Sequence, residues 1–181
     1  MMEQAAKDLI VLDFCSSTYE MELEDYSLPA DQLKFTATPK EAITQSKMDG
    51  ERYPVVILCR NIPIGFLVLH DWNGAKQYTN NRRAILVRAY SIDSRYQGKG
   101  YAKQSLKLLT AFVKKHFPNK NEIILAVYHK NTVAQNLYRK SGFTENGTRL
   151  MGRKGELIVM SKVITNELLD PRIPIVKSCS L

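Results

Sequence analysis

The chain has 181 residues, 44% of them hydrophobic and 24% charged, which is typical of a globular domain and excludes disordered, collagen-like and coiled-coil chains. With 26 Lys and Arg against 18 Asp and Glu, the formal net charge is +8, so we expect an anionic partner such as a nucleic acid, a membrane surface or a phosphorylated cofactor. The longest apolar runs fall short of the roughly 18 residues that cross a bilayer, and the N-terminus lacks a basic and apolar leader, which disfavours a membrane-spanning or secreted protein.

The first third of the chain predicts one strand and two helices. Residues 8–15 form an apolar run typical of a strand, and the serines and threonine that follow can cap a helix beginning near Tyr19. Thr38 and Glu41 have the spacing of a capping box around a proline at the first helical position, so a second helix is predicted to extend to about Met48.

The rest of the chain predicts a sheet with a long helix between its strands. Apolar periodicity and turn residues predict strands at 53–59, 64–70, 84–92, 122–128 and 157–164, a hairpin turn at 60–63, a long amphipathic helix at 100–116 and a short helix at 132–140. This order favours a mixed α/β sheet built around one central crossover. We expect a single domain over residues 1–164 and a C-terminal tail over 165–181.

The cysteines carry no metal or disulfide pattern. They are odd in number, widely spaced and without a CxxC pair, which favours reduced thiols, a cytoplasmic protein and no bound metal; they are Cys15, Cys59 and Cys179. Apolar residues in the final strand and the tail leave a homodimer possible.

A glycine-rich turn joins the 84–92 strand to the long helix. Gly98 and Gly100 let the backbone curl tightly, so that unpaired N–H groups of the first helical turn can face an anion. The turn matches neither a Walker loop nor a dinucleotide fingerprint. Taken alone, it is equally compatible with a turn that needs glycine only for packing.

Two motifs together resemble the GNAT N-acetyltransferase superfamily. Gln97-x-x-Gly100-x-Ala102 resembles the Q/R-x-x-G-x-G/A motif of that superfamily, and residues 131–143 resemble its N-x-x-A-x-x-L-Y-x-x-x-G-F signature. The motifs occur in the right order, separated by one helix and one strand. The resemblance covers about residues 53–164 and implies a mixed, mostly antiparallel sheet of six or seven strands flanked by helices, with a splayed parallel strand pair that binds acetyl-CoA.

The resemblance also implies roles for particular residues. The pyrophosphate of acetyl-CoA would be held by the turn and first helical residues Gly98, Lys99, Gly100, Tyr101, Ala102 and Lys103. The strand edge near Ile92 would pair with the pantetheine arm, its N–H would polarise the thioester carbonyl, and Asn131 would face the pantetheine. Tyr138 would donate a proton to the departing sulfur, because a phenol (pKa ~10) stays protonated at neutral pH yet is close in acidity to a thiol (~8.5). The implied reaction is direct acetyl transfer to a primary amine through a tetrahedral intermediate.

The general base remains unassigned, because the 84–92 strand contains no carboxylate. The candidates lie on other elements, and each is more often a surface residue: Glu20, Glu22, Glu24, Asp25 and Asp71.

The acceptor is predicted more loosely. Residues 23–42 and 146–156 resemble a bacterial branch that includes spermine/spermidine-type acetyltransferases. The acidic residues 20–25 suit a polycation if they line the cleft, but the interpretation that we favour for them is that they cap and solubilise the first helix. The predicted acceptor is a small polyamine-like amine, and the alternatives are a protein or peptide amine, an aminoglycoside, or a non-catalytic CoA-binding sensor. A nucleic-acid-binding module is disfavoured, because no stacking aromatic array or helix-turn-helix pattern accompanies the basic residues.

Overall fold

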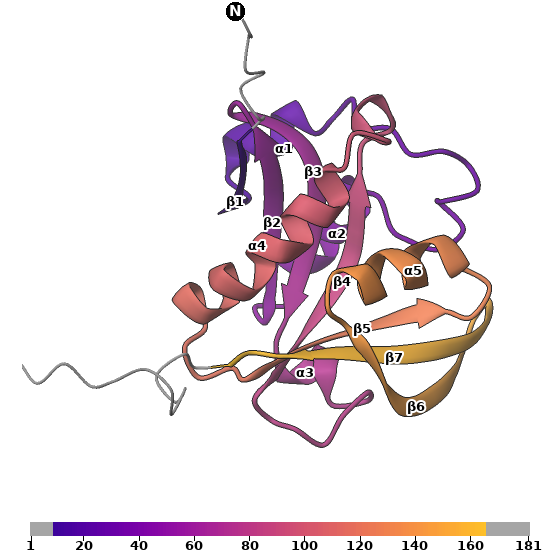
Figure 1. The fold of residues 1–181 in the computed structure, drawn as a ribbon. Coiled ribbons are helices and arrows are strands. Elements are labelled where there is room, and N and C mark those ends of the chain that lie inside the picture. Colours follow the sequence, from indigo (N-terminus) through magenta and orange to yellow (C-terminus); the bar gives the residue numbers. More distant parts are fainter. Residues whose placement is uncertain (1–8, 166–181) are drawn as a thin grey trace, which may run out of the picture.

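A seven-stranded sheet in the order β1-β2-β3-β4-β5-β7-β6 organises residues 9–165, which are the residues that the computed structural model describes (Figure 1). The strands are β1 (Ile10–Phe14), β2 (Arg52–Cys59), β3 (Ile62–His70), β4 (Ala84–Ile92), β5 (Glu122–Tyr128), β6 (Thr144–Gly152) and β7 (Gly155–Val163). The helices are α1 (Ser17–Glu22), α2 (Pro39–Lys47), α3 (Trp72–Ala75), α4 (Tyr101–His116) and α5 (Thr132–Lys140), and a short 3-10 turn (Ser94–Tyr96) precedes α4. All neighbouring strands are antiparallel except the parallel pair β4 and β5.

The predicted mixed sheet with a parallel pair is confirmed. All six predicted strands and all four predicted helices are present, and α2 has the expected capping box, in which Thr38 Oγ1 accepts a hydrogen bond from the Glu41 N–H and Glu41 accepts one from the Thr38 N–H. The hairpin turn between β2 and β3 is tighter than predicted and consists of Arg60 and Asn61, both with positive φ (51° and 65°), as type I′ geometry requires. Two elements, α3 and β6, were not predicted.

Helices cover both faces of the sheet. In Figure 1, α4 and α5 lie in front of the strands and α2 lies behind them. Buried residues of α4 such as Leu109 and Val113 share the main core with Ile57, Ile85 and other alternate residues of β1 to β5. On the other face, Ala42 and Ile43 of α2 pack on the strand residues Val56, Leu58, Phe66 and Val68.

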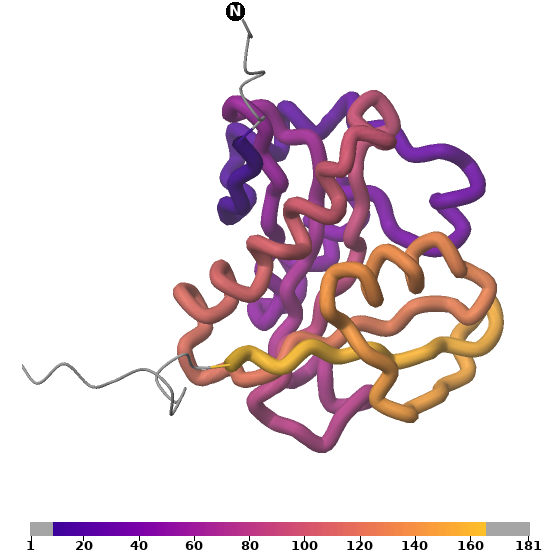
Figure 2. Tube along the Cα trace, in the orientation of Figure 1, coloured from indigo at the N-terminus to yellow at the C-terminus, as the bar shows by residue number. Residues whose placement is uncertain are grey.

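The parallel pair separates after four residues. Its register extends from Ala84↔Glu122 to Val87↔Leu125, although β4 continues to Ile92 and β5 to Tyr128. An extra residue in β4 shifts the β3–β4 register between Val68↔Arg88 and Phe66↔Ser91, and Ala89 within this bulge has φ +49°. A bulge bends the strand that carries it, and the traces of β4 and β5 diverge in Figure 2. The fold therefore has an opening in the middle of its sheet.

The structure also describes two of the three cysteines and allows a search for membrane-spanning helices and metal-binding groups. Cys15 and Cys59 are free thiols, and burial, more than neighbouring Glu20, raises the pKa of Cys15 to about 11. Between residues 9 and 165, no helix is both long and apolar enough to span a membrane, and no three His, Cys, Asp or Glu side chains gather in a way that could hold a metal ion. Cys179 and the predicted tail after residue 165 lie outside the described residues.

Candidate active site

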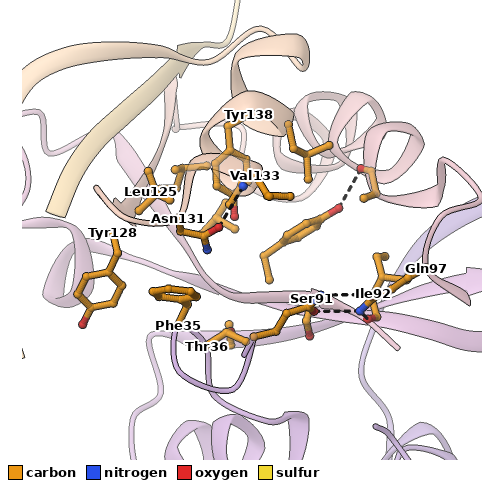
Figure 3. Close-up of a pocket in the computed structure, with 18 of the residues that line it drawn as sticks. Phe35, Thr36, Ser91, Ile92, Gln97, Leu125, Tyr128, Asn131, Val133 and Tyr138 are labelled. Carbon is orange, nitrogen blue, oxygen red and sulfur yellow. Dashed lines mark hydrogen bonds between the residues drawn. The ribbon is translucent and has the colours of Figure 1, made fainter. Parts of the chain in front are cut away.

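The opening between β4 and β5 forms a cavity of about 510 Å³. Its walls come from the separated ends of the two strands, from the turn before α4, from α5 and from the loop at residues 31–36; lining residues include Gln32, Tyr90, Ile92, Gly98, Gly100, Ala102, Val127, Asn131 and Tyr138. Figure 3 shows that Asn131 and Tyr138 approach from one side and Ser91 and Ile92 from the other. The cavity thus brings together most of the residues that the two sequence motifs singled out.

The end of β4 presents a backbone donor to this cavity. Asp93 N–H donates to the Ile64 carbonyl across the Ile92↔Gly65 pair. This bond identifies a non-hydrogen-bonded antiparallel pair, in which the N–H of Ile92 must point away from β3. Because β5 has already separated at this level, the Ile92 N–H is left for a molecule in the cavity.

The turn after β4 is fixed by polar contacts. Asp93 is fully buried, and although burial raises its pKa, hydrogen bonds from Arg95 and from the Ser27 N–H hold it below its usual range. Gln97 Nε2 donates to the Ile92 carbonyl, and the Gln97 and Gln32 amides donate to each other. The sequence analysis missed the roles of Asp93 and Gln32; the position of Asp93 directly after a buried strand was the only local signal.

The N-terminus of α4 faces the cavity without a side-chain cap. Gly98 and Gly100 have φ of +75° and +80°, and no atom lies within 4 Å of where a Cβ would stand on either glycine. Gly98, Gly100, Tyr101 and Ala102 line the cavity, whereas the exposed residues Lys99 and Lys103 do not. The Lys99 ammonium instead lies over the Tyr96 ring, 5.6 Å from its centroid. The turn therefore offers backbone N–H donors to an anion, and no side chain of residues 98 and 100 blocks its approach.

Tyr138 places a buried phenol in the cavity. It projects from α5 into the cavity (Figure 3), its ring lies 6.2 Å from that of Tyr90, and its hydroxyl has no hydrogen-bond partner among the described residues. Burial raises its pKa, so the phenol stays protonated through the neutral range. Tyr90 lines the same cavity but differs, because its hydroxyl donates to the Ala102 carbonyl and contacts Ser105 Oγ.

Asn131 has a structural role as well as a place in the lining. Its Oδ1 accepts a hydrogen bond of 3.1 Å from the Ala134 N–H and so caps α5, which leaves its NH₂ group toward the cavity side of the helix start.

The five base candidates lie elsewhere. None of Glu20, Glu22, Glu24, Asp25 and Asp71 lines the cavity; Glu20 pairs with Lys47, and Asp71 caps α3 and pairs with Lys120. Among the cavity's lining residues, the exposed Asp31 is the only carboxylate.

The sequence of this chain is similar to those of known acetyltransferases. The model of the acetyltransferase (GNAT) family matches residues 15–143. An uncharacterised N-acetyltransferase of Bacillus subtilis, YbbJ, is 42% identical over 152 residues, which are 83% of this chain and 95% of the relative. The spermine/spermidine N(1)-acetyltransferase of the same organism is 29% identical over 123 residues, which are 68% of this chain and 80% of the relative.

Solved structures share the fold at low sequence identity. The aminoglycoside acetyltransferase AAC(6')-Ib, solved with paromomycin and acetyl-CoA, superposes with a TM-score of 0.70 at 16% identity, covering 86% of this chain and 94% of the other. The spermidine N-acetyltransferase of Vibrio cholerae, solved with CoA and spermine, gives a TM-score of 0.57 at 18% identity, covering 85% and 95%.

Proposed function

Because the chain belongs to the GNAT acetyltransferase family, we propose that it transfers the acetyl group of acetyl-CoA to a primary amine. The observation that carries this proposal is the opening between β4 and β5, where the free Ile92 N–H and the unpartnered Tyr138 hydroxyl share one cavity. One is a donor for a developing oxyanion and the other an acid for a leaving group. These are two of the groups that acyl transfer requires.

The cavity and its turn fit acetyl-CoA. The positive φ of Gly98 and Gly100, the open space at both glycines and the uncapped α4 N-terminus suit a pyrophosphate, which backbone N–H groups would hold. Lys99 and Lys103 are exposed near the same turn and would add attraction for the phosphates without lining the cavity. When bound, acetyl-CoA supplies the activated acetyl group.

The chain's own groups would then act at two points. The Ile92 N–H would donate to the thioester oxygen as it gains charge, a contribution of typically a few kcal/mol in the transition state. Tyr138 would donate to the departing sulfur, and its raised pKa keeps the proton in place until the thiolate forms. Asn131 NH₂ would contact the pantetheine arm from the start of α5.

A polyamine is one candidate acceptor, since the names of two similar proteins specify spermine or spermidine. The acidic residues 20–25 give it little support, because none of them lines the cavity. The acceptor amine must lose its proton before attack, and Asp31, the only carboxylate among the cavity's lining residues, would accept it directly or through water.

The test is a product assay. Purified protein would be incubated with acetyl-CoA and a panel of polyamines, aminoglycosides, amino acids, amino phosphates and short peptides, with acetylated products identified by mass spectrometry and CoA release measured in parallel. An acetylated amine formed only with protein supports the proposal. Bound acetyl-CoA without any product would favour a CoA-binding sensor, and the absence of both binding and product would refute the proposal.

A further inference from the structure

A second cavity, of about 400 Å³, continues from the first on the face of the sheet that α2 covers. The two cavities share lining residues where β4 and β5 separate, among them Arg88, Ala89, Ala126 and Tyr128. Figure 3 shows Phe35 and Tyr128 close together at this end, with ring centroids 5.9 Å apart. Neither Gly98 nor Gly100 lines the second cavity, so it is separate from the turn that suits a pyrophosphate. A molecule placed here would approach the acetyl group from the acceptor side.

The charge of this second cavity is positive. Three arginines line it, from three different elements: Arg52 at the start of β2, Arg88 in β4 and Arg153 in the β6–β7 turn. None of its lining residues is Asp or Glu. Asp49 pairs with Arg52 from outside the lining, at 3.2 Å, and so offsets one of the three charges. Within the described residues, Arg88 and Arg153 have no ion pair with a carboxylate.

Arg88 is held in position from behind. Its Nη1 donates a 3.2 Å hydrogen bond to Nδ1 of His70, and His70 Nε2 lies 3.1 Å from Asp49 Oδ2, close enough for electrostatic attraction. A guanidinium does not give up its proton, so Nδ1 must carry the lone pair and the buried imidazole must be neutral with its proton on Nε2. Burial, followed by the nearby arginine charges, lowers the pKa of His70, which keeps the ring in this form.

The remaining donors of Arg88 are available to the cavity. A guanidinium has five N–H donors, and the contact with His70 uses one of them. Arg88 is half-buried, and no carboxylate of the described residues lies within ion-pair distance of it; Asp49, on the far side of His70, attracts it only from behind. Partial desolvation without a direct counterion favours the binding of an anion on the cavity side. Arginine donors form charge-assisted, paired hydrogen bonds with carboxylate and phosphate oxygens.

We propose that Arg88, supported by Arg153 and Arg52, binds a carboxylate or phosphate group of the acceptor at a subsite in the second cavity, which is therefore the acceptor cavity. The preferred acceptor is then a small amine that also carries a carboxylate or a phosphate. The inference rests on the proposed acetyl transfer and adds the charge of the acceptor to it. Arg88 is four residues before Ile92 on one strand, at most ~13 Å at the usual rise per residue, so one small molecule can reach both the subsite and the acetyl group.

The test compares amines matched in all but their anionic group. Amino acids would be compared with their carboxamides, and ethanolamine phosphate with ethanolamine, with spermidine as the cationic reference. We expect kcat/KM to favour the anionic member of at least one pair by roughly 10-fold to 100-fold, the range for a hydrogen bond to a charged group. Preference for the amino acids identifies a carboxylate acceptor, and preference for the amino phosphate a phosphorylated one.

Variants assign the preference to Arg88. Arg88→Gln should abolish the preference while leaving acetyl-CoA affinity unchanged, and Arg88→Lys, which keeps the charge but not the paired donors, should retain part of it. Arg82→Gln is the matched control, because it removes the same charge from an exposed arginine that lies over Trp72 outside both cavities. Thermal melts of each variant would show that it folds.

Calorimetry separates failure of the subsite from failure of the proposed function. Acetyl-CoA binding would be titrated on its own, and N-acetyl amino acids and N-acetyl ethanolamine phosphate would be titrated into wild type and Arg88→Gln. Binding of such an anion that Arg88→Gln loses supports the subsite even if no acetyl transfer is seen. Equal turnover of the matched amines, preference for spermidine, or anion binding that Arg88→Gln retains would overturn the subsite and leave acetyl transfer standing.

Discussion

Replacing Tyr138 by phenylalanine removes one oxygen atom from the site and little else. The hydroxyl has no hydrogen-bond partner in the described residues, so the substitution leaves no protein group unsatisfied. The oxygen borders the cavity and is not among the buried atoms that lack a partner, so its removal relieves little desolvation cost. We therefore expect Tyr138→Phe to have a free energy of unfolding close to that of the wild type.

The kinetic effect should be large by contrast. A positioned general acid typically contributes 10²-fold to 10⁴-fold, and its efficiency falls as its pKa moves away from that of the group it protonates. Burial raises the pKa of Tyr138 away from that of a thiol, which places the expected loss near the lower end, at about 100-fold in kcat or ~3 kcal/mol of activation free energy. Acetyl-CoA affinity should stay within about twofold, because the lost contact is made mainly in the transition state.

The assay measures CoA release at saturating amine, with a reagent that detects the free thiol. Acetyl-CoA binding is measured by calorimetry, and stability by thermal melts, on the same preparations. Tyr90→Phe provides the contrast in stability, because its hydroxyl donates to the Ala102 carbonyl; losing that bond should cost about 1 kcal/mol and lower the melting temperature by about 2–4 °C. A Tyr138→Phe enzyme with wild-type kcat would refute the acid role, and one that is strongly destabilised would refute the reasoning about its free hydroxyl.

Three further outcomes follow from other parts of the structure. Gly100→Val should raise the KM for acetyl-CoA at least tenfold. Its control, Gly147→Val, strains a similarly positive φ (+87°) outside both cavities and should lower only the stability. Steady-state kinetics and thermal melts of both variants check this. Burial lowers the pKa of His70, so at acidic pH the unfolded chain binds a proton more readily than the folded chain. The free energy of unfolding should therefore fall as the pH drops below about 6.5. Urea unfolding at pH 7.5 and pH 5.5 should show a smaller fall for His70→Gln than for the wild type. Thr38→Ala should lower the free energy of unfolding by about 1 kcal/mol, measured by urea titration, without changing KM. It removes the side-chain cap of α2 and the hydroxyl's hydrogen bond to Glu41, whereas the bond from the Thr38 N–H to Glu41 remains.

Local signals in the sequence located most elements, because those elements are set by their own residues. The capping box that begins α2 is complete within four residues, and the apolar run of β5 is buried on both faces. Strand β6 was missed because its side chains are mostly exposed and it is held by pairing with β7, a contact between segments that no short window shows. Helix α3 is only four residues long and is defined by the Asp71 cap within a polar stretch.

The same distinction applies to the site. The two motifs located the turn, Asn131 and Tyr138, since each motif is continuous in sequence. The second cavity was not foreseen, because Arg52, Arg88 and Arg153 come from three separated elements and each resembles an ordinary surface arginine when considered alone. Only the pairing of β2 and β4 with β3, through Arg52↔His70 and Val68↔Arg88, brings the first two to one face of the sheet, on either side of β3.

The bulge at Ala89 links the two cavities. Before it, Leu86 and Arg88 lie on the face covered by α2 and α3, and regular alternation would send Tyr90 to that face as well. The extra residue reverses the alternation, so that Tyr90 contacts Ala102 and Ser105 of α4 while Ser91 contacts Tyr26 on the other face. One strand thereby directs Arg88 into the second cavity and, beyond the bulge, the Ile92 N–H into the first. In the proposed mechanism, Arg88 and Ile92, which lie on either side of this bulge in β4, would therefore set the charge of the acceptor and stabilise the oxyanion.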